Sequence, residues 1–196
     1  MGTVVNVQSP RFLKPRESGR TFDITTIMKP WITFFLALLL VACASYSGRG
    51  LQPGVDGLDN VLHVMGQPAL RWQNADGSVQ LAYPRGPAGY HTYMVIIGPD
   101  DRLRQIENVL DEKHFALIQT GMSKEEVLHT LGPPYPGWTA YFKRRDELVW
   151  EWRYCDAWNE PARFDVLFDN TSGRVRSTMS RTESLRGLCG RGRCIC

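Results

Sequence analysis

The chain has 196 residues, a length that suits one ordinary domain or two small ones, and a formal net charge of +3. Residues 1–42 contain five basic and two acidic residues, which accounts for the whole charge and leaves residues 43–196 neutral. A neutral body argues against nucleic acid as the main partner, because such binding needs a basic face that displaces counterions.

Residues 1–42 are predicted to be a signal region. Trp31–Ala42 contains one polar residue, Thr33, and is too short to cross a bilayer, which takes about 20 residues. Its length is that of the apolar core of a signal peptide. Translation from Met28 would give a more compact signal than translation from Met1, so Met28 is the alternative start.

The apolar run ends in Leu40-Val41-Ala42-Cys43, which resembles the lipobox of bacterial lipoprotein signals. This resemblance implies cleavage between Ala42 and Cys43 and a covalent lipid on Cys43, which becomes the mature N-terminus. Ala44 stands where a signal for retention in the inner membrane would usually have Asp, so the resemblance implies the outer membrane. Residues 43–52 then form a polar tether, and the protein is anchored to the membrane without spanning it.

A first unit is predicted over residues 53–110. Asp56 and Asp59 bracket a helix start, and the helix runs to Gly66. Alternating apolar residues from Val79 to Tyr83 predict a half-buried strand. Two further strands are expected at 90–97 and 103–109, joined by the turn residues 98–101, which indicates an antiparallel meander.

A second unit is predicted over residues 111–183. A short helix at 111–119 precedes a second helix, which begins at Ser123 with Glu126 three residues later, the signature of a capping box. Gly132 followed by two prolines ends that helix. Leu148–Tyr154 is the clearest strand, and the strands 164–168 and 174–176 follow it.

The two units match each other in sequence. Val61–Pro68 and Val127–Pro134 are identical at five of eight positions, at a separation of about 66 residues. Both units keep the order helix, strand, strand, strand. The predicted fold class is therefore α+β, with two tandem small units, each with helices packed on one face of a three-stranded antiparallel sheet. Residues 184–196 remain as a basic, cysteine-containing tail.

The second unit resembles a known family. Gly121-Met122-Ser123, Leu131-Gly132, Trp150–Tyr154 and Phe164–Phe168 are similar to the BamE/SmpA/OmlA family of bacterial outer-membrane lipoproteins. The resemblance implies two helices on a three-stranded antiparallel sheet, a fold shared with the secreted β-lactamase inhibitor protein, which has two such units in tandem. It also implies an accessory role in the assembly of outer-membrane β-barrels. The first unit is included through its match to the second.

Four cysteines remain once Cys43 carries lipid, namely Cys155, Cys189, Cys194 and Cys196. In an oxidising periplasm they allow two disulfides in any of three pairings, and we favour a bond between Cys155 and one cysteine of the tail. Their spacing fits no standard zinc pattern. His63 and His129 occupy equivalent helix positions but lack neighbours with ligand spacing, so no metal and no cofactor other than the lipid are expected.

The sequence indicates no enzyme, because it contains no nucleophile elbow or phosphate loop. Candidate partner-binding residues are the aromatic residues outside the expected core and the charged residues of the strand faces, because aromatic residues dominate interface hot spots. These candidates are Trp138, Tyr141, Glu151, Arg153, Trp158 and Asp165.

The leading interpretation is a non-enzymatic lipoprotein of the outer membrane that faces the periplasm and binds an envelope protein. The family resemblance implies a β-barrel assembly subunit as that partner. A second interpretation is a periplasmic hydrolase inhibitor that uses the exposed sheet faces of both units. A third is a module that binds lipid or cell wall through Arg186, Arg191 and Arg193 in the tail.

Overall fold

The computed structural model describes residues 47–86, 89–189 and 195–196, and residues 44–196 form one compact unit. The signal region 1–42, with Met28 and Ala42, the lipidation site Cys43 and the tether up to residue 46 lie outside the described residues. Arg191, Arg193 and Cys194 of the tail do so as well. Within the described ranges, no helix has the length and apolar character required to cross a bilayer.

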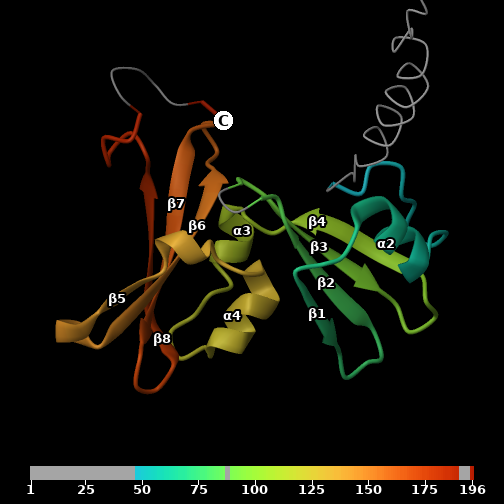
Figure 1. Cartoon of the computed structure of the whole chain (residues 1–196), viewed down its shortest axis with the longest axis horizontal. Coiled ribbons are helices and arrows are strands. Elements are labelled where there is room, and N and C mark those ends of the chain that lie inside the picture. Colours follow the sequence, from blue (N-terminus) through green and yellow to red (C-terminus); the bar gives the residue numbers. More distant parts are fainter. Residues whose placement is uncertain (1–46, 87–88, 190–194) are drawn as a thin grey trace, which may run out of the picture. The chain divides into compact units, whose positions relative to one another are not determined.

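The described chain folds into two antiparallel four-stranded sheets and three short α-helices (Figure 1). The first sheet has the strand order β1-β2-β3-β4, and the second has the order β5-β6-β7-β8. We call them sheet A and sheet B. The elements are α2 (Leu58–Met65), β1 (Leu70–Gln73), β2 (Val79–Pro84), β3 (Thr92–Ile97), β4 (Leu103–Asn108), α3 (Glu112–Phe115), α4 (Lys124–Leu131), β5 (Ala140–Phe142), β6 (Glu147–Cys155), β7 (Pro161–Asp169) and β8 (Arg174–Thr182).

The prediction of three-stranded sheets is wrong, because each sheet has a further strand at its start. In sheet A this strand is β1, which pairs with β2 from Leu70 opposite Ala82 to Gln73 opposite Val79. In sheet B it is β5, which has only three residues and pairs with the beginning of β6. Strands of three or four residues are too short to show a period of two, so their partners, and not their own sequences, define them.

The expected arrangement of helices on one face of each sheet is also wrong, because sheet A is in contact with helices on both faces. Val61 and Met65 of α2 pack in a core with the inward residues of β2, β3 and β4. On the opposite face, the side-chain amide of Gln80 donates a hydrogen bond of 2.6 Å to the main-chain oxygen of His129 in α4. Trp72 of β1 packs edge-on against His129 on this same side. Helix α4 therefore serves both sheets.

Sheet B packs against α3 and α4 with one face. The alternation predicted for Leu148–Tyr154 is confirmed, since Trp152 and Tyr154 are buried in the same core as Val127 and Leu131 of α4. The capping box predicted at Ser123 and Glu126 is confirmed as well. In Figure 1 the helices α3 and α4 lie between the strands of the two sheets. This arrangement leaves the opposite face of sheet B without a covering helix among the described residues.

Gly132, which follows α4, makes a close approach to sheet A possible. Its φ is +72°, and a Cβ atom there would lie 2.7 Å from Cγ2 of the buried Thr92. Gly66, the equivalent residue after α2, has a φ of +80° but no atom within 4 Å of the same position. Both glycines thus have a positive φ, which disfavours other residues. Only at Gly132 would a side chain also clash with a neighbouring residue.

We predict that Gly132→Ala lowers the free energy of unfolding more than Gly66→Ala does. Both substitutions force alanine into a glycine conformation, at a cost of about 1–3 kcal/mol. Gly132→Ala adds the overlap with Thr92, which we expect to cost roughly 1–3 kcal/mol more. Denaturant unfolding of the two variants tests this, and equal losses of stability would show that α4 does not pack closely on sheet A.

Candidate functional site

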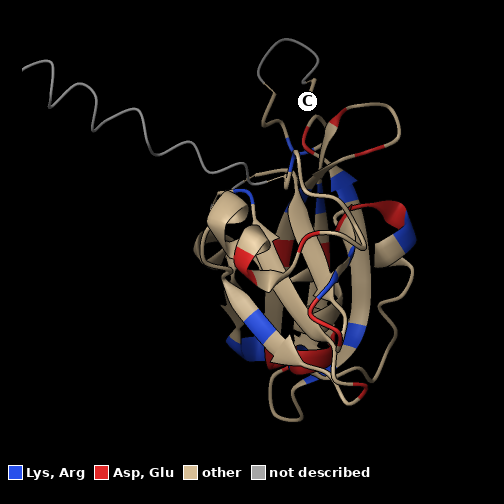
Figure 2. Ribbon diagram, turned by 90° about the vertical axis from the view of Figure 1, so that its right-hand side faces the viewer, with Lys and Arg blue, Asp and Glu red and all other residues tan. Residues whose placement is uncertain are grey.

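The outer face of sheet B, opposite α3 and α4, carries the charged residues of the strands. Strand alternation places Glu147, Val149, Glu151 and Arg153 of β6 on this face. The register then sets Glu151 directly opposite Asp165 of β7, and Arg163 of β7 opposite Arg181 of β8. Figure 2, which is viewed from the right-hand side of Figure 1, shows basic and acidic residues interspersed along the ribbon of the chain as a whole.

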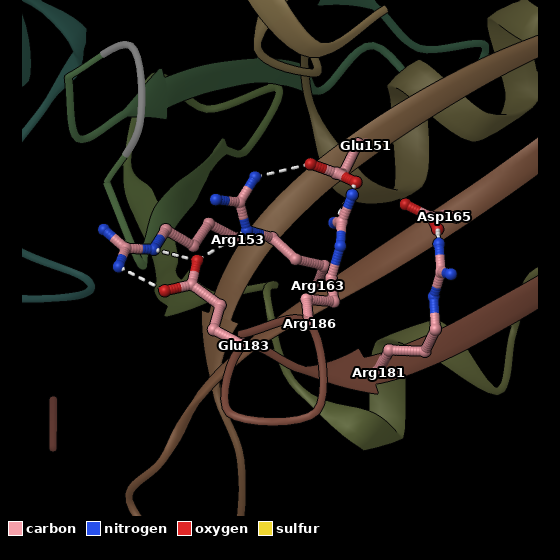
Figure 3. Close-up of polar contacts among 7 residues, drawn as sticks. All are labelled: Glu151, Arg153, Arg163, Asp165, Arg181, Glu183 and Arg186. Atoms are coloured by element: carbon pink, nitrogen blue, oxygen red, sulfur yellow. Dashed lines mark hydrogen bonds and ion pairs between the residues drawn. The ribbon is translucent and has the colours of Figure 1, made fainter. Parts of the chain in front are cut away.

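Arg163 is the centre of an ionic network on this face (Figure 3). Its guanidinium donates to Glu151 and, from Nε over 2.5 Å, to Oε1 of Glu183. Glu183 also accepts two hydrogen bonds from Arg153, of 2.7 and 2.6 Å. The ring of Trp138 lies 3.6 Å from Cζ of Arg163, a cation–π contact. Arg163, Glu151 and Glu183 are all buried, so their charges compensate each other out of water.

Glu151 and Asp165 form a buried pair of carboxyl groups with different protonation behaviour. Burial raises the pKa of Asp165, and the neighbouring Glu151 raises it further against the opposing effect of Arg181. Burial also acts to raise the pKa of Glu151, but hydrogen bonds from Arg186 and Asp165 and the charge of Arg163 outweigh it and lower that pKa. As the pH rises, Glu151 therefore loses its proton before Asp165 does.

The hydrogen bonds of Asp165 agree with this assignment. Its Oδ2 accepts a hydrogen bond of 2.8 Å from Arg181, whereas its buried Oδ1 accepts none within the described part of the chain. A negative charge is therefore less favourable on Asp165 than on Glu151.

A groove with a volume of about 430 Å³ runs along the outer face. Its apolar lining comes from β5 to β8 and consists of Ala140, Phe142, Val149, Leu167 and Met179. Its polar lining consists of Arg145, Glu147, Glu151, Asp165, Arg181 and Arg186, with Trp138 beside them. The groove therefore combines an apolar floor with charged groups at both ends, a composition typical of sites that bind another chain.

The tail folds back onto this face instead of leading away from it. Nη1 of Arg186 donates a hydrogen bond of 2.7 Å to Oε2 of Glu151. Cys196 forms a disulfide with Cys155, the last residue of β6, across 41 residues. These contacts hold both ends of the segment 183–196 near the end of sheet B. Arg186, considered above as a lipid-binding residue of the tail, is part of the groove.

The structure brings together some of the predicted partner-binding residues and separates others. Trp138, Glu151 and Asp165 line the groove, and Arg153 is joined to them through Glu183. Tyr141 does not line it, since its hydroxyl donates to Asp146 at the turn before β6. Trp158 lies in the loop after β6, is 85% exposed and is not part of the groove lining.

Sequence reasoning missed several residues of the groove and of the ionic network beside it. Arg163 and Leu167 could have been found, because they alternate with the predicted inward residues Phe164, Val166 and Phe168. Arg181 and Glu183 could not, because the third strand of the second unit was expected only at 174–176, whereas β8 extends to Thr182. A strand with one buried residue among nine carries no apolar alternation that would mark its length.

The histidines serve structural contacts. His129 pairs through Nε2 with Oδ1 of Asn74 at 3.0 Å and packs against Trp72, and His114 bonds to Asp111, the cap of its own helix. Over the ranges that the structure describes, no three potential metal ligands gather. A second cavity, of about 310 Å³, lies between Pro84, Pro134 and Trp152 and is lined mainly by prolines and aromatic rings.

Comparison of the chain with protein-family models, curated proteins and solved structures gives no match in any of the three. The resemblance to the BamE/SmpA/OmlA family stays a prediction from the sequence. The geometry of the groove and of its ionic network is therefore the main structural indication of function.

We predict that Glu183→Gln lowers the free energy of unfolding by about 3 kcal/mol at neutral pH, because it leaves two arginines without their buried acceptor charge. The matched control is Asp100→Asn, which breaks an exposed pair with Arg104 and should cost below about 1 kcal/mol.

The effect of Glu183→Gln should also depend on pH. Burial raises the pKa of Glu183, but the hydrogen bonds from Arg153 and Arg163 outweigh it, so the pKa lies below the usual 4.5. The stabilisation is present above the unfolded-state pKa and is lost as the pH falls through the folded-state value. Unfolding curves from pH 7 to pH 3 should show the difference between wild type and variant narrowing below 4.5. A constant difference would contradict the role given to the charge of Glu183.

Proposed function

We propose that the protein is a non-enzymatic docking module that binds an envelope protein in the groove on the outer face of sheet B. One observation carries this proposal: an apolar floor lies within a charged face that no α-helix covers among the described residues. Met179 and Phe142 are 40% and 46% exposed there, although strand alternation usually places such side chains either in a core or under a partner.

The ionic network supports docking more than catalysis. Every buried carboxylate of the network is held by an arginine: Glu183 pairs with Arg153 at 2.6 Å and with Arg163 at 2.5 Å, Glu151 pairs with Arg186 at 2.7 Å, and Asp165 pairs with Arg181 at 2.8 Å. Charges fixed in this way keep the strand face rigid, and a rigid face loses little conformational entropy when a partner binds. A general acid or base instead needs an open approach to a reacting group, which these buried atoms do not offer.

The lipobox-like segment before Cys43 supports an anchor in the outer membrane, with the docking face directed to the periplasm. The resemblance to the BamE/SmpA/OmlA family suggests a β-barrel assembly subunit as the partner. The inhibitor alternative required free faces on both sheets for a common concave surface. Because the second face of sheet A contacts α4, only sheet B supports docking, and we do not adopt this alternative.

Site-specific photo-crosslinking in living cells tests the docking proposal. A photoreactive residue at Met179, in the groove, should give a discrete protein adduct, whereas the same residue at Leu117 should not. Leu117 is 56% exposed and follows α3, which packs on the opposite face of sheet B, so it is a matched control for exposure. Adducts of equal yield from both positions, or from neither, would overturn the proposal.

The anchor is tested separately. We expect labelled palmitate to enter the full chain and to be absent from a Cys43→Ser variant, which should also leave the membrane fraction. Incorporation that persists without Cys43 would contradict the assignment of the lipidation site. The crosslinking result at Met179 does not depend on this outcome if the variant still reaches the periplasm.

A further inference from the structure

The groove exposes its basic side chains to solvent and buries its acidic side chains. The side chains of Arg145, Arg181 and Arg186 are 62%, 42% and 32% exposed. Their carboxylate partners Glu147, Asp165 and Glu151 are only 9%, 3% and 8% exposed. The acidic groups thus lie beneath the basic ones, and an approaching ligand meets guanidinium groups.

Each of these arginines keeps donors for a further acceptor. Within the described residues, each one reaches its carboxylate through a single terminal nitrogen, although a guanidinium has five N–H donors. The contact between Arg145 and Glu147 is an ion pair of 2.8 Å without the alignment of a hydrogen bond, since Oε1 of Glu147 has no hydrogen-bond partner. Cζ of Arg145 also lies 5.0 Å from the ring centre of Phe142. The guanidinium groups are therefore held in place without being saturated.

The arginines occupy the two ends of the groove, and apolar side chains occupy the middle. Glu147 and Glu151, which hold Arg145 and Arg186, are four residues apart on β6, so their Cα atoms are separated by roughly 13 Å. Val149 lies between them on the same face, and its partners on the neighbouring strands are Ala140 and Leu167, which also line the groove. The order along the groove is cation, apolar floor, cation.

An extended peptide has the complementary spacing. Side chains two residues apart share one face of an extended chain, so two acidic side chains four positions apart also span roughly 13 Å. The residue midway between them points to the same side and meets the apolar floor. A carboxylate can also accept two parallel hydrogen bonds from a guanidinium, which makes this pairing stronger than a single contact. A lipid bilayer fits less well, because a planar surface does not enter a groove sunk into a sheet.

We propose that the groove binds an extended protein segment with the pattern acidic, any residue, apolar, any residue, acidic. This inference rests on the proposed docking function and names the chemistry of the partner. The buried carboxylates Glu147, Glu151 and Asp165 act as positioning residues for the arginines, and the arginines contact the segment.

The direct test uses the full chain in a non-ionic detergent and fluorescein-labelled synthetic peptides. The probe is Gly-Glu-Ser-Leu-Ser-Glu-Gly, and binding is followed by fluorescence anisotropy. Two control peptides replace both glutamates by lysine, or place the two glutamates next to each other. We expect saturable binding of the probe, at least tenfold weaker binding of either control, and weaker binding of the probe at higher salt. Equal binding of all three peptides, or no binding of the probe, would overturn the proposal.

Arginine variants locate the interaction. Arg145→Gln and the double variant Arg181→Gln with Arg186→Gln should each weaken binding of the probe about tenfold or more, because each removes charge-assisted hydrogen bonds to one carboxylate. Arg104→Gln is the matched control, since Arg104 is also exposed and held by one carboxylate, but belongs to sheet A. Glutamine retains a donor for the buried carboxylates, and thermal unfolding checks that each variant is folded. Full affinity in the groove variants would contradict the site.

Two further results separate this inference from the proposed function. If the probe fails to bind while Met179 still yields a specific crosslink, the docking function holds and the acidic pattern is wrong. If both fail, the groove is not a docking surface. Vesicles containing phosphatidylglycerol form the third arm: vesicle binding that the arginine variants abolish, in the absence of peptide binding, would assign the groove to a lipid headgroup and overturn the proposal.

Discussion

The packing of α4 between two sheets is the constraint on which the rest of the structure depends. Val127 and Leu131 of this helix are buried in the core of sheet B, while the main-chain oxygen of His129 and the adjoining Gly132 lie against sheet A. Helix α4 has only eight residues and therefore a small surface. Because it packs against both sheets, it helps to cover the apolar residues of each. It also decides which sheet face stays open. Sheet A has helices on both faces, and sheet B has them on one.

The open face of sheet B is stabilised by charges instead of by apolar contacts with a helix. Arg163 lies between two buried glutamates and against the ring of Trp138. Removal of either glutamate, or of Arg163, would leave an uncompensated charge out of water. Glu183, which follows β8, and Arg186 of the tail contribute to this network, and the disulfide at Cys155 holds the chain end close to it. A face built in this way is rigid and polar. These properties suit a surface that is exposed to solvent whenever no partner is bound.

In the proposed docking function, a chain that is neutral beyond residue 42 presents a charged surface to its partner. Residues 43–196 have no net charge, and the acidic and basic residues of the groove are nearly balanced. The acidic groups are more deeply buried than the basic groups, however, so a ligand would contact the basic groups first. Carboxylates beneath arginines fix the guanidinium groups in position, so the cationic groups need not become ordered when a carboxylate binds. Net charge alone does not indicate such a surface.

Short-range signals in the sequence were sufficient to predict several local elements. The capping box at Ser123, the helix end at Gly132 and the inward alternation of Leu148–Tyr154 follow from short-range sterics and hydrogen bonding, which operate before any tertiary contact forms. Tertiary structure alone decided the existence of β1 and β5, the length of β8, the contact of α4 with sheet A and the depth of each charge on the outer face. β1 and β5 depend on pairing with the next strand, 5 to 12 residues away, and the other features depend on more distant partners, such as Gln80 for His129, 49 residues apart, and Glu183 for Arg153, 30 residues apart. The local pattern of these segments does not encode such pairings.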